Sequence, residues 1–147
     1  MSPRSRARES ATAAWRHIFD YIRATAADRV ALLERLGLTP AESRALSSLD
    51  PDAGRSMRSL AEEWACDPSN ATWLVDRLER QGLAKRVPRD GDRRVKAVVL
   101  TPKGKKLRGD LIESLYTPPP DLVALPQRDL DALRAAASRL PTRHTNP

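Results

Sequence analysis

The amino-acid sequence predicts a mainly α-helical fold that contains one small β-hairpin. Apolar residues recur at helical spacing through most of the 147-residue chain. Two short β-type runs, residues 83–87 and 95–100, flank the dipeptide Asp90-Gly91, which is typical of a hairpin turn. Proline or glycine stands at most of the boundaries between these segments, where such residues end or begin helices.

Composition narrows the classes of protein to consider. The chain has the size of one domain, a net charge of +7 and a pI near 10.3, which favours acidic partners such as nucleic acid. No apolar run approaches the roughly 18–20 residues of a membrane-spanning helix, and no secretory signal is recognisable. We therefore expect a cytoplasmic protein without a membrane partner. One cysteine and two distant histidines predict no disulfide, no metal site and no cofactor.

The N-terminal part is predicted to hold a basic disordered arm, residues 1–9, followed by a long helix. From Ala11 the pattern is helical, and the helix is expected to continue to about Leu36, where Gly37 ends it. Four residues at spacing i, i+3, i+4 and i+7 form its apolar face: Trp15, Ile18, Phe19 and Ile22.

The central part predicts a helix-turn-helix. Thr39-Pro40 begins a short helix that ends near Leu49, and residues 57–65 have helical composition. Asp67 and Pro68 then supply an N-cap and a first helical residue, and Gly82 ends the helix that follows. Two helices joined by about three residues form this motif, and a hairpin directly after it is a wing.

Two further helices are predicted after the wing. Thr101-Pro102 begins one that ends near Tyr116, and the last covers about residues 126–140 before Pro141. Ten of the 26 basic residues lie between Lys85 and Arg108, so the densest positive charge falls on the wing and the start of the following helix.

Helix 68–80 carries side chains suited to reading DNA on the face opposite its apolar residues. Asparagine can bond adenine in a bidentate way, arginine can read guanine, and the first turns of a recognition helix reach the bases. The candidate base or backbone contacts are Ser69, Asn70, Thr72, Trp73 and Arg77. The plainer interpretation is a solvated helix face, with Trp73 packed against the protein.

The wing supplies the second set of candidate DNA contacts. Neutralising phosphates with cations releases counterions, and arginine in a narrow minor groove reads DNA shape. The candidates are Arg86, Arg89, Arg93, Arg94 and Lys96. A charged strand edge that prevents aggregation is the alternative, although it explains one or two cations better than this cluster.

The chain resembles the MarR family of winged helix-turn-helix regulators. The resemblance is carried by "GLTPAESRALSSL", "SLAEEWACDPSNATWLVDRLERQGL", "RDGDRR" and "LTPKGKKL", which span about residues 37–107. It implies a homodimer held by the first and the last two helices, which binds a pseudo-palindromic DNA operator as a repressor and is released by a small-molecule effector. The implied division is a winged helix-turn-helix DNA-binding region at 37–101 between dimerisation helices at 10–36 and 102–147.

The resemblance also implies that an acid on the recognition helix pairs with an arginine of the wing, here Asp76 with Arg94. An isolated two-stranded hairpin is marginally stable, so the wing needs such an anchor. Neighbours on a strand point to opposite faces, so Arg94 is assigned to the anchor and Arg93 to DNA.

Other functions stay open on the sequence. Trp15, Phe19 and Tyr21 are candidates for a ligand pocket, although core or dimer packing explains them too. Cys66 lies in the predicted turn as a structural residue, or as the sensor of a redox-responsive regulator. A winged-helix module that binds protein is the alternative to DNA binding. An enzyme would need a catalytic constellation, and no such motif is recognisable.

Overall fold

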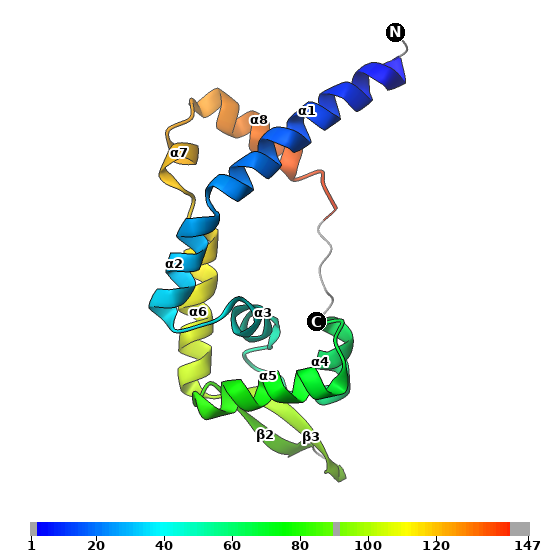
Figure 1. Cartoon of the computed structure of the whole chain (residues 1–147), viewed down its shortest axis with the longest axis vertical. Coiled ribbons are helices and arrows are strands. Elements are labelled where there is room, and N and C mark those ends of the chain that lie inside the picture. Colours follow the sequence, from blue (N-terminus) through cyan, green and yellow to red (C-terminus); the bar gives the residue numbers. More distant parts are fainter. Residues whose placement is uncertain (1–2, 90–91, 142–147) are drawn as a thin grey trace. The chain divides into compact units, whose positions relative to one another are not determined.

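The computed structural model describes residues 3–89 and 92–141, with only the backbone of residues 3, 89 and 92–95 (Figure 1). Its elements, in chain order, are α1 (Pro3–Ala24), α2 (Ala26–Leu36), α3 (Pro40–Ser48), β1 (Arg55–Ser56), α4 (Met57–Glu63), α5 (Pro68–Arg80), β2 (Ala84–Arg89), β3 (Asp92–Leu100), α6 (Pro102–Tyr116), α7 (Pro120–Val123) and α8 (Gln127–Ala137). The predicted fold class, mainly α with a small β-hairpin wing, is confirmed.

The sheet has three antiparallel strands in the order β1-β3-β2, one more than the sequence predicts. The hairpin pairs Ala84 with Leu100 and Pro88 with Lys96, and the register shifts between Pro88 and Arg89. The additional strand, β1, pairs Arg55 with Val98 on the other edge of β3. It joins the base of the wing to the start of α4.

Residues 1–40 form one compact unit with two helices. Residues 3–9 are helical, which corrects the expected disordered arm: they lack glycine, and Pro3 stands at the first helical position, where its missing N–H costs nothing. The long helix is also divided at Thr25. The Thr25 hydroxyl donates to the carbonyl of Tyr21 at 2.9 Å, a bond that bends helices. Gly37 ends α2 at φ 68°, as predicted.

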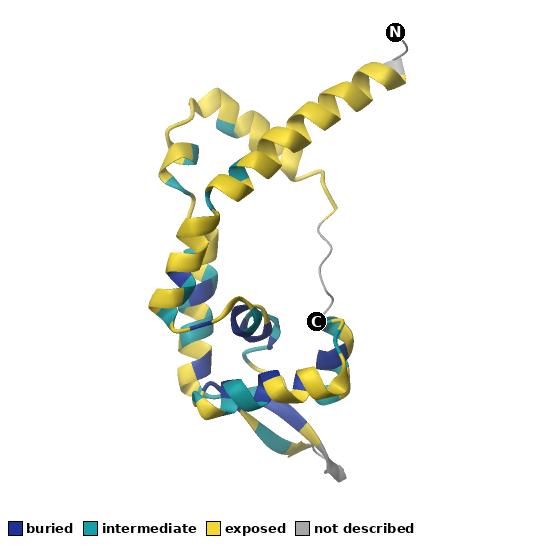
Figure 2. Cartoon of the chain, in the orientation of Figure 1, coloured by how far each residue is buried: buried dark blue, intermediate teal, exposed yellow. Residues whose placement is uncertain are grey.

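Residues 41–147 form the second unit, and its core lies among α3, α4, α5 and the sheet. Buried residues line the inner faces of these elements (Figure 2). The largest fully buried apolar side chains of this unit are Leu46, Leu49, Leu60, Val75, Leu78, Leu83, Val98 and Leu111. The apolar face predicted for α5 is therefore part of this core.

Helix α6 begins in tight contact with the segment that follows α5. The Thr101 hydroxyl caps it, accepting from the N–H of Gly104 at 3.0 Å and donating to the carbonyl of Gly82 at 2.6 Å. A Cβ at Gly104 would lie 1.8 Å from the carbonyl oxygen of Leu83. Only glycine permits this approach, which fixes α6 to the winged region.

The C-terminal segment holds two helices where the sequence predicts one from about residue 126 to 140. Neither α7 nor α8 has a buried residue. None of the helices described is both long enough and apolar enough to cross a membrane.

Candidate nucleic-acid interface

The helix-turn-helix consists of α4 and α5 and a turn closed by backbone hydrogen bonds. Ser56 caps α4 by accepting from the N–H of Ser59 at 3.1 Å. In the turn, Ala65 has φ 49°, and the N–H of Cys66 donates to the carbonyl of Ala61 at 3.1 Å. Helix α5 then begins with Pro68, as predicted.

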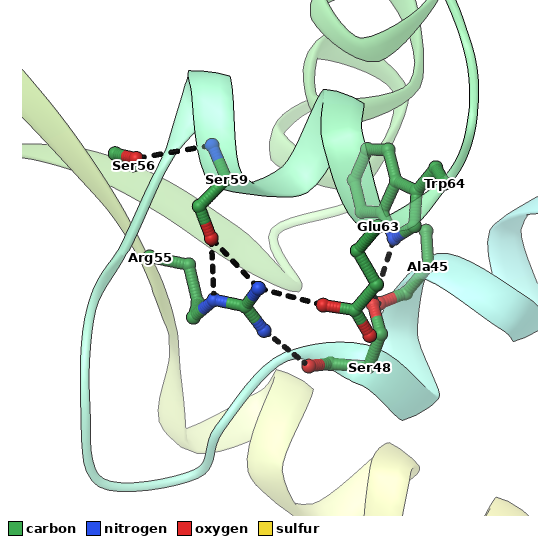
Figure 3. A network of polar contacts seen from close by, with 7 residues as sticks. All are labelled: Ala45, Ser48, Arg55, Ser56, Ser59, Glu63 and Trp64. Carbon is green, nitrogen blue, oxygen red and sulfur yellow. Dashed lines mark hydrogen bonds and ion pairs between the residues drawn. The ribbon is translucent and has the colours of Figure 1, made fainter. Parts of the chain in front are cut away.

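A network of polar side chains fixes α4 to β1 and α3 (Figure 3). The Arg55 guanidinium donates to the Ser59 hydroxyl at 2.9 and 2.7 Å and pairs with the Glu63 carboxylate at 2.6 Å. The Trp64 indole N–H donates to the Ser48 hydroxyl at 2.8 Å. None of these residues is predicted from the sequence to have a role. Their contacts hold α4 in place, and α5 packs against α4.

Helix α5 turns its polar residues outward, as the sequence predicts. Ala71, Leu74, Val75 and Leu78 are buried on one side. The residues exposed on the other side are Ser69, Asn70, Thr72, Trp73 and Arg80. Four of the five candidate contacts on this helix are therefore accessible to a ligand.

The fifth candidate, Arg77, is held by a buried acid. Its Nε donates to Oε1 of Glu42 at 2.9 Å, and Gln81 Nε2 donates to the same oxygen at 2.9 Å. The side chain of Glu42 is 1% exposed, whereas that of Arg77 is 39% exposed. Glu42 was missed, although it lies three and four residues before the core residues Ala45 and Leu46. That spacing puts an acid on a buried helix face, which calls for a partner.

The base of the wing is anchored to α5 through Arg86. Its Nη1 lies 2.8 Å from Oδ1 of Asp76 and also pairs with Glu79. The N–H of Arg86 donates to the Glu79 carboxylate at 2.8 Å. The side chain of Arg86 is only 19% exposed, whereas that of Asp76 is 42% exposed.

The other wing candidates are only partly described. Lys96 is exposed on β3, whereas the side chains of Arg89, Arg93 and Arg94 lie outside the described residues. The predicted Asp76–Arg94 pair and the Asp90-Gly91 turn lie outside them too. The described partner of Asp76 is Arg86, which is predicted from the sequence to contact DNA.

The residues proposed for a ligand pocket do not share one face of α1. The rings of Trp15 and Phe19 contact each other, with centroids 6.1 Å apart, and Trp15 is 61% exposed. Tyr21 follows Phe19 by two residues, roughly 200° around the helix, so it points away from that pair. In the part of the chain that the structure describes, no cluster of three or more potential ligands could hold a metal ion.

Cys66 is half-buried and lines a groove between α4 and the start of α5, together with Met57 and Thr72. Its position in the turn agrees with the sequence. A structural role and a redox role both remain predictions.

Comparisons with known proteins agree with this geometry. Residues 36–95 match the model of the MarR family. The HTH-type transcriptional repressor MdtR of Bacillus subtilis (strain 168) is 36% identical over 72 residues, which are 49% of this chain and 46% of MdtR. The chain spans about half the length of the curated relatives it matches.

Solved structures extend the likeness in fold beyond that segment. The YusO protein of Bacillus subtilis has a TM-score of 0.64 at 24% identity, covering 94% of this chain and 96% of YusO. A mutant of S. aureus MepR bound to an oligodeoxyribonucleotide has a TM-score of 0.67 at 22% identity, covering 87% and 93%. The predicted resemblance to the MarR family is thus confirmed, and residues 36–95 are the segment of the chain that matches the family model.

Proposed function

We propose that the chain is a DNA-binding transcriptional regulator that acts as a repressor. One observation carries this proposal: α5 exposes Ser69, Asn70, Thr72 and Trp73 while its opposite face is buried in the core. The wing that follows α5 carries part of the densest positive charge in the sequence. Base-reading groups on a fixed helix beside a basic hairpin suit the major groove and the adjacent phosphates.

The relatives support the same function and no enzymatic one. MdtR is named as a transcriptional repressor, and MepR has been solved with an oligodeoxyribonucleotide. A repressor acts on chromosomal DNA, so we also propose a cytoplasmic location. Arg86 is better assigned to holding the wing than to DNA, because Asp76 and Glu79 already neutralise its charge.

We propose that two copies of the chain form a homodimer through their terminal helices. Ile22 on α1 and Leu133 and Leu140 in the C-terminal segment are 44, 44 and 64% exposed, and exposed apolar faces mark interaction sites. A two-fold dimer would place its recognition helices in half-sites about 10 base pairs apart on a pseudo-palindrome. Analytical ultracentrifugation tests this, and a stable monomer at micromolar concentration would contradict it.

We further propose that a small-molecule effector releases the DNA. The exposed pair Trp15 and Phe19 is the candidate binding surface, since the two tilted rings offer apolar area to an aromatic ligand. A thermal-shift screen of aromatic compounds against the native chain and Trp15→Ala tests the effector. A compound that stabilises both equally would place its site elsewhere.

The experiment that tests DNA binding is a mobility shift with the DNA upstream of the chain's own gene, at 50 and 200 mM salt. If each subunit neutralises several phosphates, affinity falls on the order of 10³-fold between these concentrations. Asn70→Ala is expected to cost about 1–3 kcal/mol of binding free energy. Gln127→Ala on α8, which also removes an exposed amide, serves as the control and is expected to leave binding unchanged. A flat salt response would favour the protein-interaction module.

A further inference from the structure

Trp73 is an unusual residue for the solvent side of a helix. Its side chain is 54% exposed on α5. At 3.6 residues per turn it lies roughly 150° around the helix from the centre of the buried face, so it cannot turn into the core. It lies one turn after Ser69 on the face that we assign to DNA. Tryptophan is enriched at interfaces because it offers a large apolar area, so an exposed ring at the centre of this face is available to contact a ligand.

The ring is held in place by a chain of side chains that leads to the core. The guanidinium carbon of Arg77 lies 5.7 Å from the centroid of the Trp73 ring, within cation–π range. Arg77 is fixed in turn by the buried carboxylate of Glu42. The ring is therefore oriented before any partner arrives, which lowers the entropy lost on binding.

The chemical groups of Trp73 and Arg77 determine which group of a base pair they can recognise. An indole has one N–H donor and no acceptor, so it cannot form the bidentate pattern that reads adenine or guanine. The charge of Arg77 is engaged by Glu42, which makes it a poor reader of guanine. The apolar group that the major groove offers is the C5-methyl of thymine.

We infer that Trp73 is a specificity-determining residue that recognises a thymine methyl group in the operator half-site. Arg77 and Glu42 act as positioning residues that orient the indole. This inference rests on the proposed DNA binding and adds to it the base that the middle of α5 selects.

The test replaces single thymines with deoxyuridine, which keeps the base pair and lacks only the methyl group. The probe is a duplex enriched from a random pool by the native chain, and each thymine of a half-site is replaced in turn. At one position, loss of the methyl is expected to raise Kd of the native chain roughly fourfold. Trp73→Ala, measured at lower salt to keep binding detectable, is expected to bind both duplexes equally. Trp73→Phe retains a ring and should retain part of the discrimination.

Two results would overturn the inference: no position at which the native chain distinguishes thymine from deoxyuridine, or a difference that persists in Trp73→Ala. Both leave DNA binding itself intact. If the native chain enriches no duplex at all, the proposed function fails and the inference fails with it. Arg77→Ala separates the positioning role, because it should lower the thymine preference while Trp73 remains present.

Discussion

The winged region and the terminal helices show the same kind of helical pattern with opposite outcomes. Every buried residue that the structure describes lies between Leu32 and Leu111. Helix α5 buries one full face within that segment, whereas α7 and α8 bury nothing and the apolar residues of α1 stay exposed. Periodicity shows that a helix has an apolar face. It does not show whether the partner of that face belongs to the same chain.

The physical reason for the difference is which elements the chain brings together. The face of α5 meets the sheet and α4, so its leucines are removed from water within one subunit. The Leu133 face of α8 remains 44% exposed. Burying apolar surface is favourable in proportion to its area, so this face retains a driving force for association. We therefore expect core substitutions to change the free energy of unfolding and terminal-helix substitutions to change the free energy of self-association.

The largest expected effect is that of a core leucine compared with a terminal one. Leu78→Ala removes a fully buried side chain and is expected to lower the free energy of unfolding by about 2–5 kcal/mol. Leu133→Ala removes a half-exposed one and should change the unfolding of the winged region by less than about 0.5 kcal/mol. Urea unfolding monitored by circular dichroism measures both.

Sedimentation of the same two variants measures self-association, which Leu133→Ala should weaken. The unfolding midpoint of Leu133→Ala should therefore depend less on protein concentration than that of the native chain. If Leu133→Ala instead costs as much as Leu78→Ala at every concentration, the α8 face is packed within its own subunit and the comparison fails.

The second effect lies within α6, which begins at the winged region and carries two glycines in different settings. Gly104→Ala places a methyl group against the Leu83 carbonyl and is expected to cost about 1–3 kcal/mol or more. At Gly109 a Cβ meets nothing within 4 Å, so Gly109→Ala should stabilise the helix by about 0.5–1 kcal/mol. Thermal unfolding of the two variants checks the pair. Equal effects would mean that α6 does not approach Leu83 this closely.

Several features of the fold could be read from the sequence because each has a local cause. The start of α5 at Pro68, the end of α2 at Gly37 and the apolar face of α5 follow from helix-terminus signals and periodicity over a few residues, although the Asp67 side chain makes no capping hydrogen bond. Strand β1 could not be found this way, because two residues carry no alternation pattern and Arg55 is placed by its pairing with Val98. Gly104 carries the same lesson: propensity alone marks it as a weak point of α6, whereas the structure shows a close approach.

For the candidate site, the sequence shows which residues carry side chains suited to DNA. It does not show which of these side chains are already paired with other residues of the chain. Ser69, Asn70, Thr72 and Trp73 are exposed as expected, since a helix face follows from spacing. Arg77 and Arg86 are held by acids that lie 35 residues and 7 residues away in the chain. A count of charges cannot separate a free cation from a paired one, because pairing depends on tertiary packing.

The third prediction concerns the wing anchor. A double-mutant cycle on Asp76→Ala and Arg86→Ala, measured on operator affinity, should give a coupling free energy of up to about 1 kcal/mol. The value is small because Asp76 is 42% exposed and its charge is partly screened by water. Both single variants should weaken DNA binding by loosening the wing. The matched control is Arg58 and Glu62, an exposed pair at 3.0 Å on α4, whose coupling should be smaller.

The same cycle examines the pair that the sequence predicts. Coupling between Asp76→Ala and Arg94→Ala on operator affinity would show that both arginines share the acid. Strict additivity there, together with coupling to Arg86, would make Arg86 the anchor and return Arg94 to the candidates for DNA contact. Additivity in both cycles would contradict an anchor at Asp76 altogether.

The smallest expected effect lies in the loop between α3 and β1, which is closed by local polar contacts. The carboxylate of Asp50 accepts from the N–H groups of Asp52 and Ala53 at 2.7 and 2.9 Å, and these two hydrogen bonds lower the pKa of Asp50 below its ordinary value. Because the folded pKa lies below the unfolded one, its stabilising effect is complete above the ordinary carboxyl pKa and is lost as pH falls through the folded value. Asp50→Asn keeps the acceptor oxygen but cannot titrate, so its deficit relative to the native chain should vanish in acid. Asp50→Ala removes the acceptor and should stay less stable than Asp50→Asn at every pH. Thermal unfolding across the acidic range, with NMR titration of the Asp50 carboxyl carbon, measures both. An ordinary pKa for Asp50 would show that these hydrogen bonds do not form in solution. It would weaken the contrast between the packed winged region and the exposed terminal helices.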